Sequence, residues 1–295
     1  MNLTYLHKGL SYGAILCFLF CNFSVFAQDW HVLNEEVLTE IKNGEYILAL
    51  EKAKYSRDLA EDQFGNAHAN YICSLHNLAS ARFMLGQTEE ARSIYLQSIK
   101  IAAAKYGQEK EIFAIGLYRL ADLQQGIGNL EKSELLYQQA LPVLENEGGV
   151  ASEHYATCLK NIGTLNQKMG NNLSAEEYLV KSIKIHENKE FLNIDEYSAS
   201  LHDLANLYKN TWRYDESEAL YQRVMILRSE EFDFSHPDYA EVLHDLGSLY
   251  EIQKKYEEAE NMYRKSLKIK ESKLGRTHPS YLRNMEDLTQ LSQVK

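Results

Sequence analysis

Hydrophobic and polar positions alternate along this chain with the period of a helix. From Tyr71 to Leu85, apolar residues recur three and four positions apart, which predicts an amphipathic helix. Gly86 ends that run, and a second amphipathic run follows from Glu89 to Tyr106. The pattern therefore predicts a pair of helices joined by a short turn, with a longer loop after the second helix.

The same pair returns every 42 residues. One column of the repeat holds small residues, one holds turn glycines and one holds aromatic residues. The columns are Ala49, Ala91, Ser133, Ala175, Ser217 and Ala259; Gly44, Gly86, Gly128 and Gly170; and Tyr71, Phe113, Tyr155, Tyr197, Tyr239 and Tyr281. Such self-similarity is typical of a solenoid, in which each unit buries its apolar face only by stacking on its neighbours. We therefore expect an all-α fold with one elongated core.

Further residues are expected to mark where helices begin and end. A second glycine column predicts left-handed residues just past the longer helices: Gly65, Gly107, Gly149 and Gly275. In the segment SHPDY, Ser235 is expected to accept a hydrogen bond from the amide of Asp238, with Pro237 in the first turn. His236 and His278, each before a proline, are expected to pack or to cap.

Some positions depart from the repeat. Pro142 lies inside a helical pattern, which predicts an early kink or stop. Trp212 and Lys254 replace the turn glycine, which predicts a less left-handed turn and an exposed Trp212. In the fourth repeat, Leu179 replaces the tyrosine of the neighbouring repeats, and Tyr178 stands one position earlier. Leu173 is likewise displaced by one position relative to Tyr214 and Tyr256. These displacements predict an adjusted register in the fourth repeat.

The segment from His236 to Gly275 resembles the tetratricopeptide repeat, in the 42-residue variety of kinesin light chains and many bacterial proteins. The resemblance covers roughly residues 30 to 295. It implies a right-handed α-α superhelical solenoid of stacked helix-turn-helix units. We place the units at about 28–66, 67–108, 109–150, 151–192, 193–234 and 235–276, with a closing helix over 277–295.

The resemblance also implies where a partner binds. In this family, the first helix of each pair lines a concave groove that receives proteins or peptides. Carried over column by column, the candidate groove residues are His76, Asn77, Tyr118, Arg119, Asp122, Lys160, Asn161, His202, Asp203, Asn206, His244 and Asp245. These side chains are polar, varied and able to form hydrogen bonds, as peptide recognition requires.

Charge along this groove is graded. Basic residues lie in the middle units (Arg119, Lys160 and Lys168), and acidic residues lie toward the end (Asp203, Glu241, Asp245 and Glu251). This order suggests that a partner places acidic groups against the middle and basic groups against the C-terminal half. The alternative is that these are solvated polar residues without a partner.

The N-terminal residues read as a targeting segment. A cation at Lys8, an apolar run from Leu10 to Phe20 and a small residue at Ala27 predict a secretory signal at residues 1–27, cut after Ala27. A retained anchor is the alternative. The rest of the chain has no comparable apolar stretch, so no membrane insertion is expected after signal removal. The prediction is an exported protein, periplasmic or extracellular.

Composition narrows the function classes. The chain carries 31 Lys and Arg against 42 Asp and Glu, which argues against nucleic acid or anionic lipid as a partner. Cys73 and Cys158 lie two repeats apart, too far for a disulfide, and are expected to be thiols, Cys158 for packing. Histidines in successive layers lie too far apart for a metal site.

The sequence therefore predicts a scaffold without catalysis, cofactor or metal. No nucleophile stands beside a base, and no glycine-rich phosphate loop occurs. The expected function is an exported array that binds a protein or peptide in its concave groove. Two alternatives stay open. One is a sensing module related to larger signalling or caspase-like protease (CHAT) proteins. The other is that the groove receives the array's own terminus or another copy, which gives a homo-oligomer.

Overall fold

The computed structural model describes residues 29–149, 152–188, 193–231 and 236–294. Every regular element within these ranges is an α-helix, and no strand occurs in them. The all-α prediction is confirmed. The predicted signal at residues 1–27 lies outside the described residues.

The chain forms two units, one ending at Leu85 and the other beginning at Gly86. The first unit contains α2 (Trp30–Asn43), α3 (Tyr46–Phe64) and α4 (Ala69–Met84). Helix α3 packs against both of the others, and the indole Nε1 of Trp30 donates to Ser74 Oγ over 2.7 Å. Ser56 Oγ lies 3.2 Å from the same hydroxyl, so one buried hydrogen-bonded group joins the three helices.

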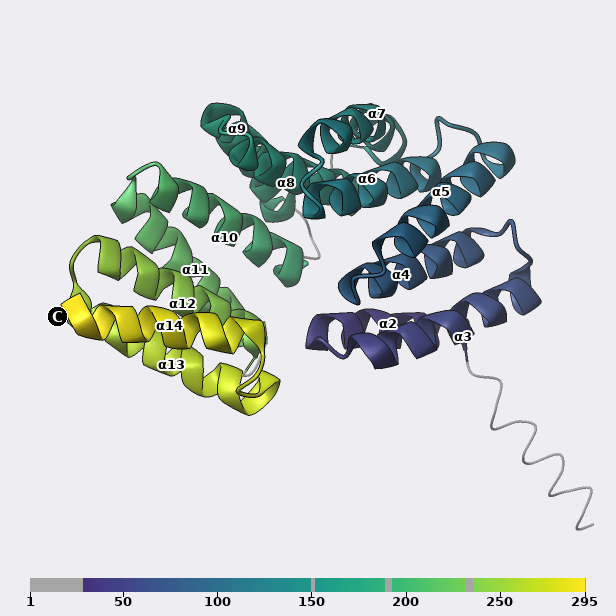
Figure 1. The fold of residues 1–295 in the computed structure, drawn as a ribbon. Coiled ribbons are helices and arrows are strands. Elements are labelled where there is room, and N and C mark those ends of the chain that lie inside the picture. Colours follow the sequence, from purple (N-terminus) through teal and green to yellow (C-terminus); the bar gives the residue numbers. More distant parts are fainter. Residues whose placement is uncertain (1–28, 150–151, 189–192, 232–235, 295) are drawn as a thin grey trace, which may run out of the picture. The chain divides into compact units, whose positions relative to one another are not determined.

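The second unit continues the same arrangement through ten consecutive helices (Figure 1). They are α5 (Thr88–Lys105), α6 (Glu111–Gly126), α7 (Leu130–Gly148), α8 (Glu153–Lys168), α9 (Asn172–Glu187), α10 (Ile194–Asn210), α11 (Tyr214–Glu231), α12 (Pro237–Ile252), α13 (Tyr256–Leu274) and α14 (Pro279–Val294). Each helix packs against the next. The first helices of successive pairs also touch, α6 with α8, α8 with α10 and α10 with α12, so they form one layer.

Within each unit, the small-residue column lies where paired helices cross. All six of its members are fully buried: Ala49, Ala91, Ser133, Ala175, Ser217 and Ala259. The serine hydroxyls donate hydrogen bonds to the facing helix: Ser133 Oγ donates to Ala121 O over 2.9 Å, and Ser217 Oγ donates to Ala205 O over 2.8 Å. A larger side chain at these crossings would overpack the contact, which explains why the column is small.

The turn between paired helices is left-handed in every repeat where it is described, with or without glycine. The column from Gly44 to Gly170 has positive φ, and Trp212 and Lys254 both have φ of 61°. The prediction of a less left-handed turn at these two positions is therefore wrong. Arg213 N donates to Tyr208 O over 2.9 Å and Lys255 N to Tyr250 O over 2.8 Å, as Asn129 N does to Gln124 O. These closing hydrogen bonds hold the turn despite the steric cost of a side chain.

Trp212 is 79% exposed, as predicted. The glycines after the longer helices behave differently from the expectation. Gly65, Gly149 and Gly275 have positive φ but extended ψ of 158°, 166° and 163°, so they are not left-handed helical. The prediction of left-handed residues is therefore wrong at these three positions, although the region that they occupy is also open essentially to glycine alone.

Helix α7 runs through Pro142 to Gly148, so the predicted stop is wrong. The proline removes one backbone donor. Beyond it, Leu144 is fully buried and Val143 packs against the same apolar cluster, which anchors the last turns of the helix.

The register of the fourth repeat is unchanged, contrary to the expectation. Leu179 is fully buried at the position where the neighbouring units carry Tyr137 and Tyr221. Leu173 is 87% exposed, at the position of the acidic first-turn residues Glu131 and Asp215. The substitutions changed the side chains without shifting the helix.

Histidines cap the first helices in both units. His236 Nδ1 accepts from the amide of Asp238 over 3.2 Å, and His278 Nδ1 accepts from Ser280 N over the same distance. His68 does the same for Asn70. Capping by His236 and His278 is thus confirmed, while Ser235 lies outside the described residues. No helix within the described ranges is long and apolar enough to span a membrane.

Candidate functional site

Most of the predicted groove residues lie on the first helices of the second unit. We call the polar side chains of α6, α8, α10 and α12 the first-helix face. His76 and Asn77 belong instead to α4 of the first unit, where both are buried, 4% and 8% exposed. Asn77 Nδ2 donates to Asn34 Oδ1 over 2.8 Å, so this amide is already used inside its own unit.

Hydrogen bonds join one layer to the next at recurring sequence separations. Contacts 36 residues apart include Lys160 with Glu196, and contacts 39 apart include Asn161 with Asp122. Contacts 43 apart include His202 with Asp245. Each value lies close to the repeat length of 42, so a side chain on one first helix meets the matching region of the next.

In α6, Tyr118 and Arg119 start this face. Tyr118 is 1% exposed, and its hydroxyl lies 3.2 Å from Nδ1 of His154. Burial lowers the pKa of His154, so this ring is neutral at neutral pH. The guanidinium carbon of Arg119 stands 5.4 Å from the centre of the Tyr118 ring, a cation–π contact.

Asp122 is the hydrogen-bonded centre of the next turn. Asn161 Nδ2 donates to its Oδ1 over 2.8 Å, and the Tyr137 hydroxyl donates to the same oxygen. Burial raises the pKa of Asp122, although these two donors oppose the shift. The predicted residue Asn206 also accepts a hydrogen bond from a tyrosine, since the Tyr221 hydroxyl donates to its Oδ1 over 2.6 Å.

Lys160 forms an ion pair with Glu196 of the following first helix. Its Nζ lies 2.9 Å from Glu196 Oε2, and the lysine side chain is only 14% exposed. Burial opposes the charge on Lys160, but the nearby carboxylates of Glu196 and Asp203 outweigh it and raise the pKa. Burial likewise opposes the charge of Glu196, yet Lys160 lowers its pKa overall. Both members are therefore charged at neutral pH.

His202, Lys209 and Asp245 form a second charged group. His202 Nε2 donates to Asp245 Oδ2 over 2.8 Å, and Lys209 Nζ donates to Oδ1 over 3.2 Å. Burial would raise the pKa of Asp245, but the bond from His202 and the charge of Lys209 hold it well below its usual range. Both carboxylate oxygens are occupied.

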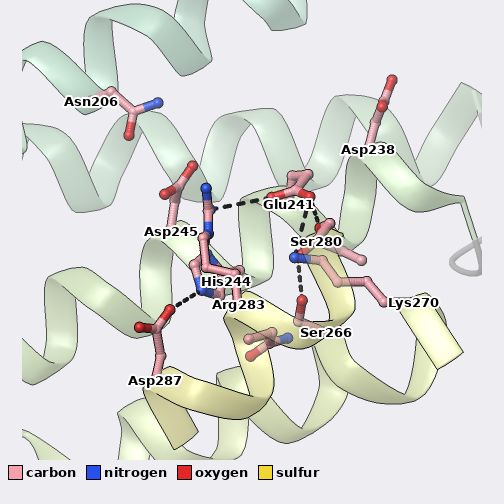
Figure 2. Close-up of polar contacts among 12 residues, drawn as sticks. Asn206, Asp238, Glu241, His244, Asp245, Ser266, Lys270, Ser280, Arg283 and Asp287 are labelled. Carbon is pink, nitrogen blue, oxygen red and sulfur yellow. Dashed lines mark hydrogen bonds and ion pairs between the residues drawn. The ribbon is translucent and has the colours of Figure 1, made fainter. Parts of the chain in front are cut away.

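The C-terminal end carries the most densely connected group, which we call the Glu241 cluster (Figure 2). Glu241 of α12 contacts three side chains from α13 and α14: Lys270 over 3.2 Å, Arg283 over 3.6 Å and the Ser280 hydroxyl. Lys270 is fully buried, and this desolvation lowers its pKa even though Glu241 opposes the shift.

His244 lies beside this cluster and binds α14. Its Nε2 donates to Asp287 Oδ2 over 2.6 Å, while Arg283 donates to its Nδ1 over 3.0 Å (Figure 2). One ring nitrogen donates and the other accepts, as in a neutral imidazole. Burial and the charge of Lys270 lower the pKa of His244, in agreement with that state.

Two partly buried charged residues of the face form no ion pair and no side-chain hydrogen bond in the described part of the chain. Arg119 has a buried Nε without a hydrogen-bond partner, and its guanidinium forms no ion pair with any described residue. Asp203, half-buried in α10, forms no hydrogen bond or ion pair within the described ranges. Burial raises the pKa of Asp203, although the charges of Lys160 and His202 oppose this.

The described residues contain no group of three or more His, Cys, Asp and Glu side chains placed to hold a metal ion. Cys73 and Cys158 form no disulfide within these ranges. Cys158 is fully buried in the apolar core, and burial raises the pKa of its thiol, so its role is packing, as predicted. The chemistry this face supports is hydrogen bonding and charge pairing.

Residues 32–104, 113–188 and 196–272 match the family model of the tetratricopeptide repeat. The chain belongs to the tetratricopeptide repeat family. No curated protein sequence matches this tetratricopeptide repeat chain. The predicted resemblance is confirmed, and structures with kinesin-light-chain repeats are among its structural neighbours.

Solved structures share the tetratricopeptide repeat fold at low identity. BtubC (BKLC) from P. vanneervenii is 19% identical with a TM-score of 0.62, over 81% of this chain and 93% of that one. A Rap protein complexed with competence and sporulation factor is 16% identical with a TM-score of 0.62, over 90% and 75%. Kinesin-light-chain TPR-like repeats of Podosopora anserina are 19% identical with a TM-score of 0.50, over 68% and 95%. These likenesses show the fold alone.

Several residues that complete the face were not among the predicted ones. They are His154, Glu196, Lys270, Arg283 and Asp287. The closing helix was expected only to end the stack with polar residues, but Arg283 and Asp287 bind back to α12 and Asn284 is fully buried. The separations of 36, 39 and 43 residues are a sequence signal that finds these partners, except Lys270, which lies on a second helix.

Proposed function

We propose that this protein is an exported, non-catalytic scaffold that binds a protein or peptide along its first-helix face. The observation that carries the proposal is the row of hydrogen-bonding side chains at matching positions of α6, α8, α10 and α12. Tetratricopeptide repeats serve as interaction scaffolds, and the Rap protein with a similar fold was solved with a bound factor.

Binding to this face is tested by capture from the native cell envelope followed by mass spectrometry. The wild-type protein is compared with Gln167→Trp, which places a large ring on α8 one repeat before Lys209, in the same column of the face. The matched control is Gln222→Trp, an exposed position on the second helix α11. We expect a specific partner to be retained by wild type and by Gln222→Trp and lost from Gln167→Trp. Equal retention by all three proteins contradicts binding at this face.

Export is tested separately. Expression of the full chain in a Gram-negative host, followed by mass measurement of the protein from the periplasm, should give a mature form that begins at Gln28. An intact N-terminus in the cytoplasmic fraction contradicts the export part of the proposal and leaves partner binding unaffected.

A further inference from the structure

Several charged groups of the first-helix face are neutralised by ion pairs inside the protein. Lys160 is paired with Glu196, and Asp245 with His202 and Lys209. Glu241 is paired with Lys270 and Arg283. Pairing therefore cancels the charges of Lys160, Asp245 and Glu241 within the predicted gradient, and these three residues have little charge left for a partner.

Arg119 is an exception. Its cation–π contact is with the Tyr118 ring, and its N–H groups have no hydrogen-bond acceptor among the described residues. Buried Nε has no hydrogen-bond partner. The nearby carboxylates Asp122 and Glu196 are bonded to other donors. Arg119 thus retains the two-pronged donor geometry that fits a carboxylate.

Asp203 is the complementary exception. It is half-buried in α10, and Lys160, the cation whose charge acts on it most strongly, donates its hydrogen bond to Glu196. Its carboxylate therefore keeps its acceptor sites available.

These two residues occupy one column of the repeat. Arg119, Asn161 and Asp203 follow each other at intervals of 42 residues on α6, α8 and α10, which touch in sequence. A partly desolvated charge without a partner costs stability, and natural proteins retain such costs mainly at functional positions. Two opposite, partly buried and unpaired charges in one column of the face therefore indicate a binding role.

We propose that a partner peptide binds this column in an extended conformation, with a carboxylate on Arg119 and a lysine or arginine side chain on Asp203. This inference rests on the proposed function and names the partner's chemistry. Two layers of packed helices span about 20 Å. An extended chain covers that distance in about six residues.

The anionic group is a carboxylate rather than a phosphate. Asp122 and Glu196 both contribute negative charge around Arg119. A doubly charged phosphate is repelled by these neighbours more strongly than a singly charged carboxylate is. A peptide with phosphoserine in place of its acidic residue should therefore bind no more tightly.

The test is selection from a displayed library of random 16-residue peptides on wild type, Arg119→Gln and Asp203→Asn. Wild type should enrich peptides with an acidic and a basic residue about six positions apart. Arg119→Gln should lose the acidic preference and Asp203→Asn the basic one. For a synthetic enriched peptide, fluorescence anisotropy should show affinity losses on the order of 10- to 100-fold for Arg119→Gln and about 10-fold for Asp203→Asn.

Matched controls carry the same substitutions on second helices. Arg264→Gln and Asp215→Asn change exposed residues of α13 and α11 and should leave affinity within about twofold. Circular dichroism confirms that each variant is folded. Three outcomes overturn this inference but leave peptide binding intact. The enriched peptides could lack the charge pair, or they could carry it about 13 positions apart, as in a helix. The third outcome is an affinity that neither variant changes. Absence of any enriched peptide on wild type contradicts the proposed function itself.

Discussion

The C-terminal end and the middle of the second unit use similar polar residues in opposite ways. At the end, the Glu241 cluster and the His244–Asp287 pair connect α12, α13 and α14. In the middle, Arg119 and Asp203 stand in one column with their charges unpaired. The comparison teaches that position on a repeat does not decide role: a charge that is bonded inside contributes to stability, and one left unbonded is available to a partner.

Removal of Glu241 should have the largest effect on the C-terminal end. Glu241→Gln leaves the fully buried Lys270 without its counter-charge. A broken buried pair costs about 3–5 kcal/mol, and since Glu241 is itself 34% exposed we expect about 2–3 kcal/mol less free energy of unfolding. Urea unfolding followed by circular dichroism measures it. Lys270→Met, which removes the buried charge itself, should cost far less, and an equal loss in both variants contradicts this account.

Asp245→Asn should sharpen the comparison within the face. The variant loses charge-assisted bonds from His202 and Lys209, and we expect a loss of about 2 kcal/mol at pH 7. Because the pKa of Asp245 is lowered in the fold, its contribution is present above about pH 4 and is lost as the pH falls below that. Unfolding curves of wild type and variant should therefore converge at low pH. A difference that persists there points to lost packing instead.

A packing substitution tests whether charge alone separates the two regions. A Cβ on Gly247 would lie 2.8 Å from Cδ1 of Tyr263, and one on Gly163 would lie 2.7 Å from Cγ of Leu179. We expect Gly247→Ala to lower the free energy of unfolding by about 1–2 kcal/mol, because overpacking outweighs the gain in helix propensity. Gly163→Ala should cost less, since Leu179 reorients more easily than the ring. Thermal unfolding compares them, and a stabilised Gly247→Ala protein contradicts the expected clash.

Asp203→Asn should have the smallest effect, with the opposite sign. Its pKa is raised by burial, so the charged form costs stability at pH 7 and this cost disappears as the pH falls below about 4. We expect the variant to gain up to about 1 kcal/mol at pH 7 in urea unfolding. The matched control Asp215→Asn should be neutral. A clear loss of stability in Asp203→Asn would show that this carboxylate is bonded inside the fold.

The sequence predicted the helix pairs because apolar spacing and repeat period reflect the same packed layer. It failed where a local rule competed with that packing. Pro142 did not stop α7 because Val143 and Leu144 beyond it are held in the core. Trp212 and Lys254 kept a left-handed turn because the closing hydrogen bonds of the motif outweigh the cost of a side chain.

The candidate site was predicted less completely than the fold. The columns placed Lys160 and Asp245 on the first helices, but not whether their charges were free. That depends on partners such as Glu196 and Lys209, which lie one layer away. A profile of single columns omits these pairs, since each joins two different columns of successive repeats.

The two tryptophans of this chain lie in contrasting surroundings. Trp30 is 5% exposed in the first unit with its indole hydrogen-bonded, and Trp212 is 79% exposed in the second. Unfolding of the first unit should shift the emission of Trp30 to longer wavelength, while Trp212 already emits from water and is quenched first by iodide. Fluorescence can therefore follow the melting of the first unit without an added dye.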